Sequence, residues 1–191
     1  IYSTTKHVDG QGRCLGGIVL GSKAFVRGTL EPYLKHTGGA MSPFNAWVML
    51  KGLETMDLRC RAQAATAELV ANDLADHEKL ARVMFPHLPD HPQYDLAKKQ
   101  MTAGGTVLAL DIRGGKDAAF RFINALEIVL ISNNLGDAKS LITHPATTTH
   151  QRLSPEIRAD LGISDGLVRI SFGLEDSDDL LNDIRCALGS V

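Results

Sequence analysis

Residues 1–17 read IYSTTKHVDGQGRCLGG, and they form the most informative segment of the chain. Lys6 follows three hydroxyl side chains and precedes four glycines. A lysine amine condenses with an aldehyde to form a Schiff base. Hydroxyl groups bond phosphate oxygens, and glycines let the backbone approach them closely. The segment therefore suits a covalently held, phosphorylated cofactor. A solvated lysine in a polar turn is the alternative, because serine, threonine and glycine are ordinary loop residues.

The composition is that of a globular protein with a core. The 191 residues give room for one domain, or one domain and a small part, and 44% of them are hydrophobic. A net charge of −2, with lysines and arginines scattered, gives no electrostatic footprint for nucleic acid or an anionic membrane. Apolar runs such as Ile128–Ile131 are too short to span a bilayer.

The three cysteines, Cys14, Cys60 and Cys186, are odd in number and widely spaced. Such a set forms neither a disulfide framework nor a zinc site and fits a reducing cytoplasm. The chain opens with no charged leader and apolar core, so nothing suggests secretion. His87 and His91 are four positions apart, but Pro89 and Pro92 argue against a helix that would place both on one face. We therefore expect no metal site.

The pattern up to residue 57 predicts short elements. Ile18–Leu20 is an apolar run bounded by glycine, which predicts a buried strand. Ala24–Leu34 has a helical pattern that Pro32 is expected to break. Ser42-Pro43 is a helix start, because the serine accepts a bond from an unpaired amide and the proline loses no hydrogen bond there. That helix is expected to falter near Gly52.

The remaining sequence begins with an alanine-rich helix, expected from about Asp57 to Asp76, and then alternates. Strands are predicted at Arg82–Phe85, Thr106–Ile112, Glu127–Ile131 and Val168–Phe172. Helices are predicted at Tyr94–Met101, Asp117–Leu126, Gly136–Leu141, Pro155–Leu161 and Asp176–Leu188. Strands that alternate with helices indicate an α/β layered domain.

Four ordered blocks resemble the Cys/Met-metabolism family of pyridoxal-phosphate (PLP) enzymes. They are Ser3–Gly17, Met41–Trp47, Ser132–Ala146 and Gly166–Asp176. The resemblance implies an α/β fold, the C-terminal part of a fold type I PLP-dependent transferase. Residues 1–57 would be the end of the large PLP-binding domain, and residues 58–191 the small C-terminal α/β domain that begins with a long connecting helix.

The resemblance also implies that part of the enzyme lies outside this sequence. Members of the family are longer, and their cofactor lysine lies near the middle. The chain is therefore expected to be the C-terminal half of such an enzyme, with the N-terminal half in the same or another chain. A homotetramer with shared active sites would be the assembled form. A catalytically incomplete fragment or subunit is the alternative.

By the same resemblance, Lys6 would hold PLP and move protons during the reaction. Ser3 and Thr5 would contact the cofactor phosphate. Arg169 lies in the middle of an apolar strand, where an unpaired charge is costly, and its planar fork matches a carboxylate. The resemblance makes it the arginine that binds the substrate α-carboxylate. An ion pair with a protein carboxylate such as Glu175 is the alternative that the residues alone leave open.

Ser132–Gly136 follows an apolar strand and is expected to enter a helix, so its polar groups would face a crevice at a strand end. The family usually has serine before Leu-Gly, whereas this chain has Asn134. Asn134 would contact the substrate, with a plain helix cap as the alternative. Thr149 would lie beside the same crevice.

Asn134 and the His7–Gly12 insert look most like the O-succinylhomoserine sulfhydrylase subfamily. That likeness implies γ-replacement of O-succinylhomoserine by sulfide, which gives homocysteine and succinate in methionine biosynthesis. Cystathionine γ-synthase and methionine or cystathionine γ-lyase chemistry would use the same residues.

Overall fold

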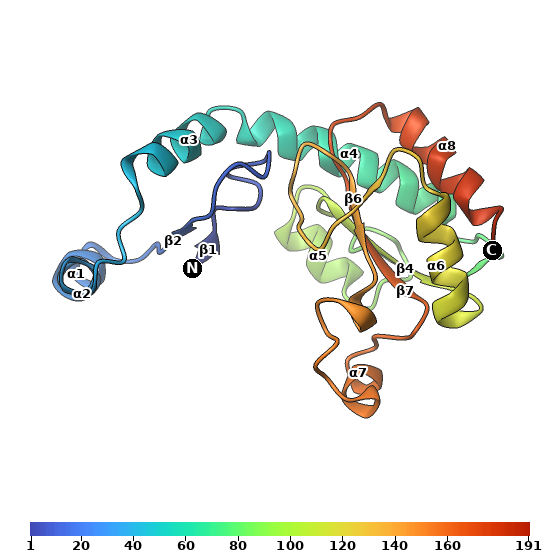
Figure 1. Ribbon diagram of the computed structural model, residues 1–191. Helices are drawn as coiled ribbons and strands as arrows, with labels where there is room; N and C mark the ends of the chain where they lie inside the picture. Colours follow the sequence, from blue (N-terminus) through green and yellow to red (C-terminus); the bar gives the residue numbers. More distant parts are fainter. The chain divides into compact units, whose positions relative to one another are not determined.

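The computed structural model describes all residues, Ile1–Val191, and the chain forms two compact units. The first is Ile1–Asp57 and the second is Leu58–Val191 (Figure 1). Their assignment to the large and small domains of a PLP enzyme stays a prediction. None of the helices is both long enough and apolar enough to cross a membrane.

The first unit consists of a two-stranded ribbon followed by short helical segments. Its elements are β1 (Tyr2–Ser3), β2 (Gly17–Ile18), α1 (Lys23–Phe25), the π-helical segment η1 (Val26–Leu30), α2 (Glu31–Thr37) and α3 (Pro43–Leu53). β1 and β2 are antiparallel, with Ser3 opposite Gly17. The ribbon therefore closes the loop that contains Lys6.

Side-chain caps set the helix boundaries of this unit. The Ser42 hydroxyl accepts a hydrogen bond from the Asn45 N–H at 3.1 Å, and Pro43 occupies the first turn of α3. The predicted helix start at Ser42-Pro43 is confirmed. α2 ends at Gly38, whose φ of 74° lies in the left-handed region that glycine tolerates best.

Two predictions for this unit are wrong. Pro32 does not break the helix, because it stands in the first turn of α2 and the π-helical turn η1 precedes it without interruption. The run Ile18–Leu20 is not buried, since Ile18 and Leu20 are 40% and 74% exposed. An isolated pair of two-residue strands provides no second layer to bury it.

The second unit is built on a five-stranded sheet in the order β3-β4-β7-β6-β5. The strands are β3 (Leu80–Met84), β4 (Val107–Ile112), β7 (Leu167–Ser171), β6 (Leu141–Thr143) and β5 (Leu130–Ile131). All neighbouring strands are antiparallel except β5 and β6. The helical elements are α4 (Met56–Leu74), α5 (Tyr94–Gln100), α6 (Gly115–Ala125), η2 (Pro145–Thr147), α7 (Pro155–Asp160) and α8 (Ser177–Leu188).

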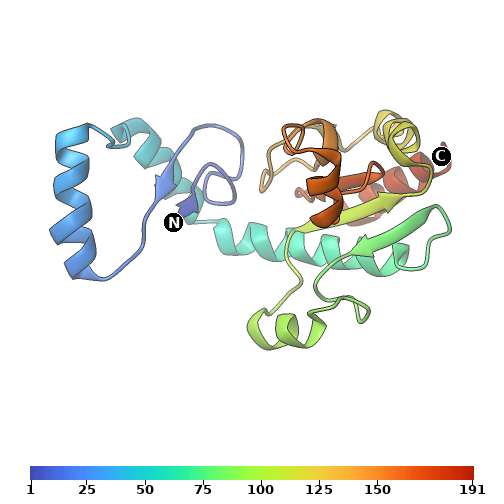
Figure 2. The ribbon, with the colours of Figure 1, turned by 90° about the horizontal axis from the view of Figure 1, so that it is seen from below.

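The apolar core lies between the sheet and the helices α4, α6 and α8. Figure 2 shows α4 running along the sheet. β7 contributes Val168 and Ile170, and Phe172 follows directly after the strand; none of the three has exposed surface. Because side chains alternate along a strand, the neighbouring positions 167, 169 and 171 of this segment point to the opposite face. Arg169 therefore lies on the side of the sheet away from the core.

The predicted helix Gly136–Leu141 is wrong. Residues 132–140 form a loop, and Leu141 begins the strand β6, which was not predicted. The N–H of Gly136 donates to the Ser171 hydroxyl at 2.9 Å, and the N–H of Ser140 donates to Glu175 at 2.7 Å. These amides are therefore satisfied by side chains from β7 and the segment after it, and no helical ladder is needed. The other five helices predicted for this unit are present.

The predicted strand Glu127–Ile131 is present only at its end, as β5. Asp183 of α8 explains the difference, because its buried carboxylate accepts from the N–H groups of Glu127, Ile128 and Val129 at 2.8, 3.0 and 3.2 Å. Backbone amides held by a carboxylate are not available to a neighbouring strand. Asp183 therefore joins α8 to the segment that leads into the sheet.

We expect Asp183→Ala to lower the free energy of unfolding by about 2–4 kcal/mol, because three backbone amides, one of them buried and two partly buried, lose a charged acceptor. Asn182→Ala, at the exposed neighbouring position of α8, is the control and should change it by less than about 0.5 kcal/mol. Urea unfolding followed by far-UV circular dichroism measures both. Equal midpoints for the two variants would contradict the role of Asp183.

Candidate functional site

Lys6 stands in a compact turn that follows β1. Its N–H donates to the carbonyl of Ser3 at 3.2 Å, and its carbonyl accepts from the N–H of Gly10 at 2.8 Å. The N–H of Asp9 donates to the carbonyl of Thr4 at 2.9 Å. These bonds fix the backbone on both sides of a half-buried lysine. The turn therefore holds the backbone of Lys6 in a well-defined position in the first unit.

The hydroxyl groups beside Lys6 differ in their contacts. Ser3 is exposed, whereas the Thr5 hydroxyl accepts from the N–H of Gly16 at 3.0 Å and donates to its carbonyl at 3.3 Å. The bond to the Gly16 carbonyl is the longer and therefore the weaker of the two, so the Thr5 hydroxyl can donate its proton to another acceptor instead. A lysine amine can condense with the aldehyde of such a cofactor, and hydroxyls can donate to its phosphate. These residues therefore fit PLP.

Asp9 organises the loop that follows Lys6. Its carboxylate has no exposed surface and accepts from the N–H and the Nε of Arg13 at 2.6 and 2.8 Å. It also accepts from the N–H of Cys14 at 3.2 Å, while the Arg13 Nη2 donates to the Asp9 carbonyl at 2.8 Å. One side chain thus closes residues 9–14 into a rigid loop. The spacing of opposite charges at Asp9 and Arg13 is a sequence signal for this contact.

α3 packs tightly behind the same turn. A Cβ atom added at Gly52 would overlap the carbonyl oxygen of Val8 and press on that of Asp9. The helix and the Lys6 turn therefore meet backbone to backbone, which only glycine permits. The helix was expected to falter near Gly52, and α3 does end at Leu53. The packing role of Gly52 was missed because it depends on a contact between residues far apart in the sequence.

Arg169 occupies the middle of β7 in the second unit. Its Nη2 donates to the carbonyls of Asn133 and Asn134 at 2.9 and 3.0 Å, and its buried Nε has no partner. Burial lowers the pKa of the Arg169 guanidinium from its ordinary value. The group still carries its charge, because arginine does not lose its proton in proteins.

The alternative ion pair between Arg169 and Glu175 is wrong. Glu175 accepts from the N–H and the hydroxyl of Ser140, at 2.7 and 2.8 Å. No carboxylate lies within ion-pair distance of Arg169. A half-buried guanidinium held only by carbonyls retains the capacity to bind an anion.

The structure brings Asn134 next to Arg169 through the carbonyl contact. The Asn134 N–H donates to the Ser132 hydroxyl at 3.2 Å, and no helix follows, so the helix-cap alternative is wrong. Thr149 is exposed in the turn after η2, where its hydroxyl bonds the Nδ1 of His150 at 2.8 Å. No hydrogen bond joins Thr149 to Arg169. The substrate contacts of Asn134 and Thr149 stay predictions.

Comparison with known proteins identifies the family. The family model described as Cys/Met metabolism PLP-dependent enzyme matches residues 1–189. The chain belongs to this family. Its cofactor is accordingly pyridoxal 5′-phosphate, and its fold is part of a fold type I PLP-dependent enzyme.

Three relatives illustrate the similarity. O-succinylhomoserine sulfhydrylase of Mycobacterium tuberculosis is 54% identical over 98% of this chain and 47% of its own length. L-methionine gamma-lyase of Pseudomonas putida is 43% identical over 98% of this chain and 48% of its own length. The crystal structure of cystathionine gamma synthase from Xanthomonas oryzae pv. oryzae, with aminoacrylate and cysteine, superposes with a TM-score of 0.94 at 37% identity, covering 98% of this chain and 49% of that chain. The chain therefore spans about half the length of the curated relatives it matches.

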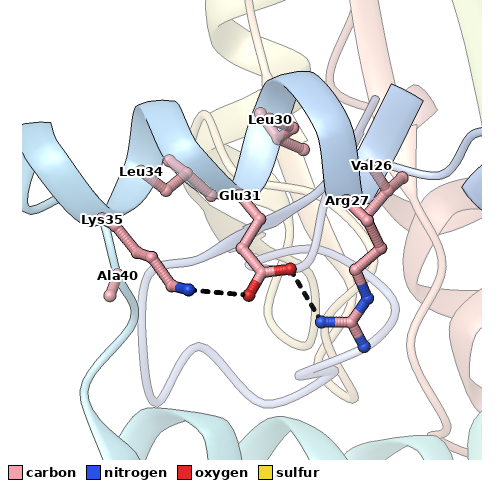
Figure 3. Close-up of a pocket in the computed structure, with 7 residues that line it drawn as sticks. All are labelled: Val26, Arg27, Leu30, Glu31, Leu34, Lys35 and Ala40. Carbon is pink, nitrogen blue, oxygen red and sulfur yellow. Dashed lines mark hydrogen bonds and ion pairs between the residues drawn. The ribbon is translucent and has the colours of Figure 1, made fainter. Parts of the chain in front are cut away.

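A hollow on the surface of the first unit is lined mainly by residues of η1 and α2, and no residue of the Lys6 turn lines it. Figure 3 shows Glu31 between Arg27 and Lys35, with ion-pair distances of 2.8 and 3.2 Å. Hydrogen bonds from Arg27 and then Lys35 lower the pKa of Glu31. These charges are four residues apart on one helical face and stabilise that face in solvent. None of the predicted site residues lines this hollow.

We expect Gly52→Ala to displace the Lys6 turn and to reduce the PLP held on Lys6, because the added methyl group has no room beside the Val8 carbonyl. Borohydride reduction followed by peptide mass spectrometry measures the phosphopyridoxyl label on Lys6, with Lys6→Ala as the blank. Gly28→Ala is the matched control, since nothing lies within 4 Å of an added Cβ there. Full labelling of Gly52→Ala would show that this contact does not position Lys6.

Proposed function

We propose that the chain supplies the cofactor lysine and the carboxylate-binding arginine of an enzyme that replaces the succinyl group of O-succinylhomoserine with sulfide. The products would be homocysteine and succinate, which places the reaction in methionine biosynthesis. The observation that carries the proposal is Arg169, a half-buried guanidinium that only backbone carbonyls hold. The 54% identity to an O-succinylhomoserine sulfhydrylase supports the choice of substrate.

Lys6 would anchor the cofactor and later serve as the base. PLP supplies an electron sink that stabilises negative charge on the amino-acid carbons. Loss of a γ-substituent requires removal of protons first from Cα and then from Cβ. A single mobile amine beside both carbons accepts and returns these protons. The fixed turn around Lys6 keeps the backbone in place while the side chain moves.

Ser3 and Thr5 would hold the phosphate. Thr5 would redirect its hydroxyl proton from the Gly16 carbonyl to a phosphate oxygen while still accepting from the Gly16 N–H. The phosphate would thereby gain a charge-assisted bond in place of a long neutral one. Ser3 is exposed and would contact the phosphate without such a change of hydrogen-bond partner.

Arg169 would bind the α-carboxylate of the substrate. A carboxylate offers two acceptor oxygens to the planar guanidinium. Its negative charge also compensates for the water that the positive charge of Arg169 has lost through burial. Asn134, whose carbonyl contacts Arg169, would form part of the polar wall that faces the acyl group of the substrate, with Thr149 as a further contact. The α-carboxylate is common to all amino-acid substrates, so Arg169 gives affinity and orientation, and the wall gives selectivity.

Cystathionine γ-synthase and methionine or cystathionine γ-lyase activities are the alternatives, because the same residues serve all of them. The identity of 54% to the sulfhydrylase against 43% to the L-methionine gamma-lyase favours γ-replacement. A catalytically incomplete subunit is a further alternative. We also propose a cytoplasmic homotetramer in which the N-terminal half, from the same or another chain, completes each active site.

The reaction is tested by its products. Given O-succinylhomoserine and sulfide, the PLP-loaded enzyme should release one homocysteine for each succinate. With cysteine in place of sulfide, turnover should be slower. Formation of 2-oxobutanoate and ammonia at the same rate as succinate would instead assign a γ-lyase. Separation of the products by chromatography distinguishes these outcomes.

We expect Arg169→Lys to lower kcat/KM by about tenfold to a hundredfold, because loss of one charge-assisted bond removes roughly 1.5–3 kcal/mol. The loss should be similar for every amino-acid substrate, and the PLP content should not change. Arg82→Lys is the matched control, since Arg82 is an exposed arginine of β3 in the same sheet. Unchanged kcat/KM with full PLP content would mark Arg169 as structural.

A further inference from the structure

The loop of residues 132–140, which joins β5 to β6, is attached to one face of β7. Arg169 donates to the carbonyls of Asn133 and Asn134, and the Ser171 hydroxyl accepts from the N–H of Gly136 at 2.9 Å. Arg169 and Ser171 are two positions apart and point to the same side of the strand. A donor and an acceptor of β7 thus grip the first part of the loop.

Glu175 holds the other end of the same loop. Its two carboxylate oxygens accept from the N–H and the hydroxyl of Ser140, at 2.7 and 2.8 Å. Ser140 has no exposed surface, and its hydroxyl also accepts from the N–H of Gly173 at 2.8 Å. Charge-assisted bonds of this length are the strong ones among side-chain hydrogen bonds. A single carboxylate therefore fixes Ser140 against the segment that follows β7.

The middle of the loop is in close contact with that segment. The N–H of Leu174 donates to the carbonyl of Ala138 at 2.8 Å, and a Cβ added at Gly173 would overlap the same carbonyl. Gln63 of α4 donates to the carbonyl of Asp137 at 2.7 Å. The loop therefore lacks regular secondary structure but has a fixed position along β7. Its position is set by bonds at both ends.

We infer that Glu175 is a positioning residue for the binding of the substrate carboxylate. Through Ser140 it fixes the loop whose Asn133 and Asn134 carbonyls orient the guanidinium of Arg169. The inference rests on the proposed function of Arg169. A long arginine side chain loses rotamer freedom when it binds a ligand, and a side chain that is already held loses less. Release of the loop would therefore weaken carboxylate binding without removing any group that touches the substrate.

The decisive measurement compares two competitive inhibitors of the PLP-loaded enzyme, L-norleucine and its decarboxylated counterpart n-pentylamine. The ratio of their inhibition constants measures how much the α-carboxylate contributes to inhibitor binding. Glu175→Gln should reduce the preference for norleucine about tenfold, because a neutral amide replaces the two charge-assisted bonds to Ser140 with weaker ones. The inhibition constant of pentylamine and the PLP content should stay unchanged. Asp176→Asn is the matched control, since it removes the neighbouring charge and retains a cap for α8.

Hydrogen exchange of the chain supplies a readout that needs neither cofactor nor substrate. The amides of Gly136, Ser140 and Leu174 should exchange faster in Glu175→Gln than in Asp176→Asn. Ser140→Ala removes the hydroxyl bond to Glu175 and leaves the N–H bond, and it replaces Glu175→Gln if that variant fails to fold. In the double variant Arg169→Lys with Glu175→Gln, the preference for norleucine should fall no further than in Arg169→Lys alone.

The outcomes separate the inference from the proposed function. Faster loop exchange in Glu175→Gln with an unchanged norleucine preference overturns the inference and leaves the role of Arg169 intact. Unchanged loop exchange in both Glu175→Gln and Ser140→Ala also overturns it. An unchanged preference in Arg169→Lys itself overturns the proposed function. Reduced preference in both single variants, with no further loss in the double variant, supports both.

Discussion

The structure depends on carboxylates that satisfy the backbone of irregular segments. Asp9 closes the loop after Lys6, Asp183 holds three consecutive amides before β5, and Glu175 holds Ser140. A buried amide without a partner is destabilising, so a segment outside helix and sheet needs such an acceptor. A carboxylate is suited to this role because its two oxygens accept several bonds at once. These three segments thereby have partners for their amides without being helical or extended.

β7 shows how one strand serves both the core and the site. Its even-numbered residues pack under α4, α6 and α8, and its odd-numbered residues Arg169 and Ser171 grip the loop on the other face. The core fixes the strand, and the strand fixes the guanidinium. Packing of the apolar face therefore contributes to the precision of the candidate polar site on the other face. A shift of the strand by one residue would exchange the two sets of side chains.

Much of this could be predicted from local sequence. The Ser42-Pro43 helix start and the alternating pattern of β4 and β7 are short-range signals, and Lys6 with its hydroxyls is a motif of contiguous residues. The loop at residues 132–140 could not be predicted, because Gly136 and Ser140 find partners more than thirty positions away. The local sequence pattern therefore predicted a helix where the chain forms a loop. Gly52 was missed for the same reason, since its packing partner lies in the Lys6 turn.

Arg82 and Arg169 show why residue type alone does not define a site. Both are arginines in strands of one sheet, and both donate to backbone carbonyls. Arg82 is exposed, so water screens its charge and an anion gains little there. Arg169 is half-buried, and its Nε has no hydrogen-bond partner. Burial has already removed part of the water around its charge, so a bound anion compensates for that lost solvation. The difference that we expect in affinity for a carboxylate comes from the loop and the strand around the guanidinium, whereas the sequence shows only a charged residue among apolar neighbours.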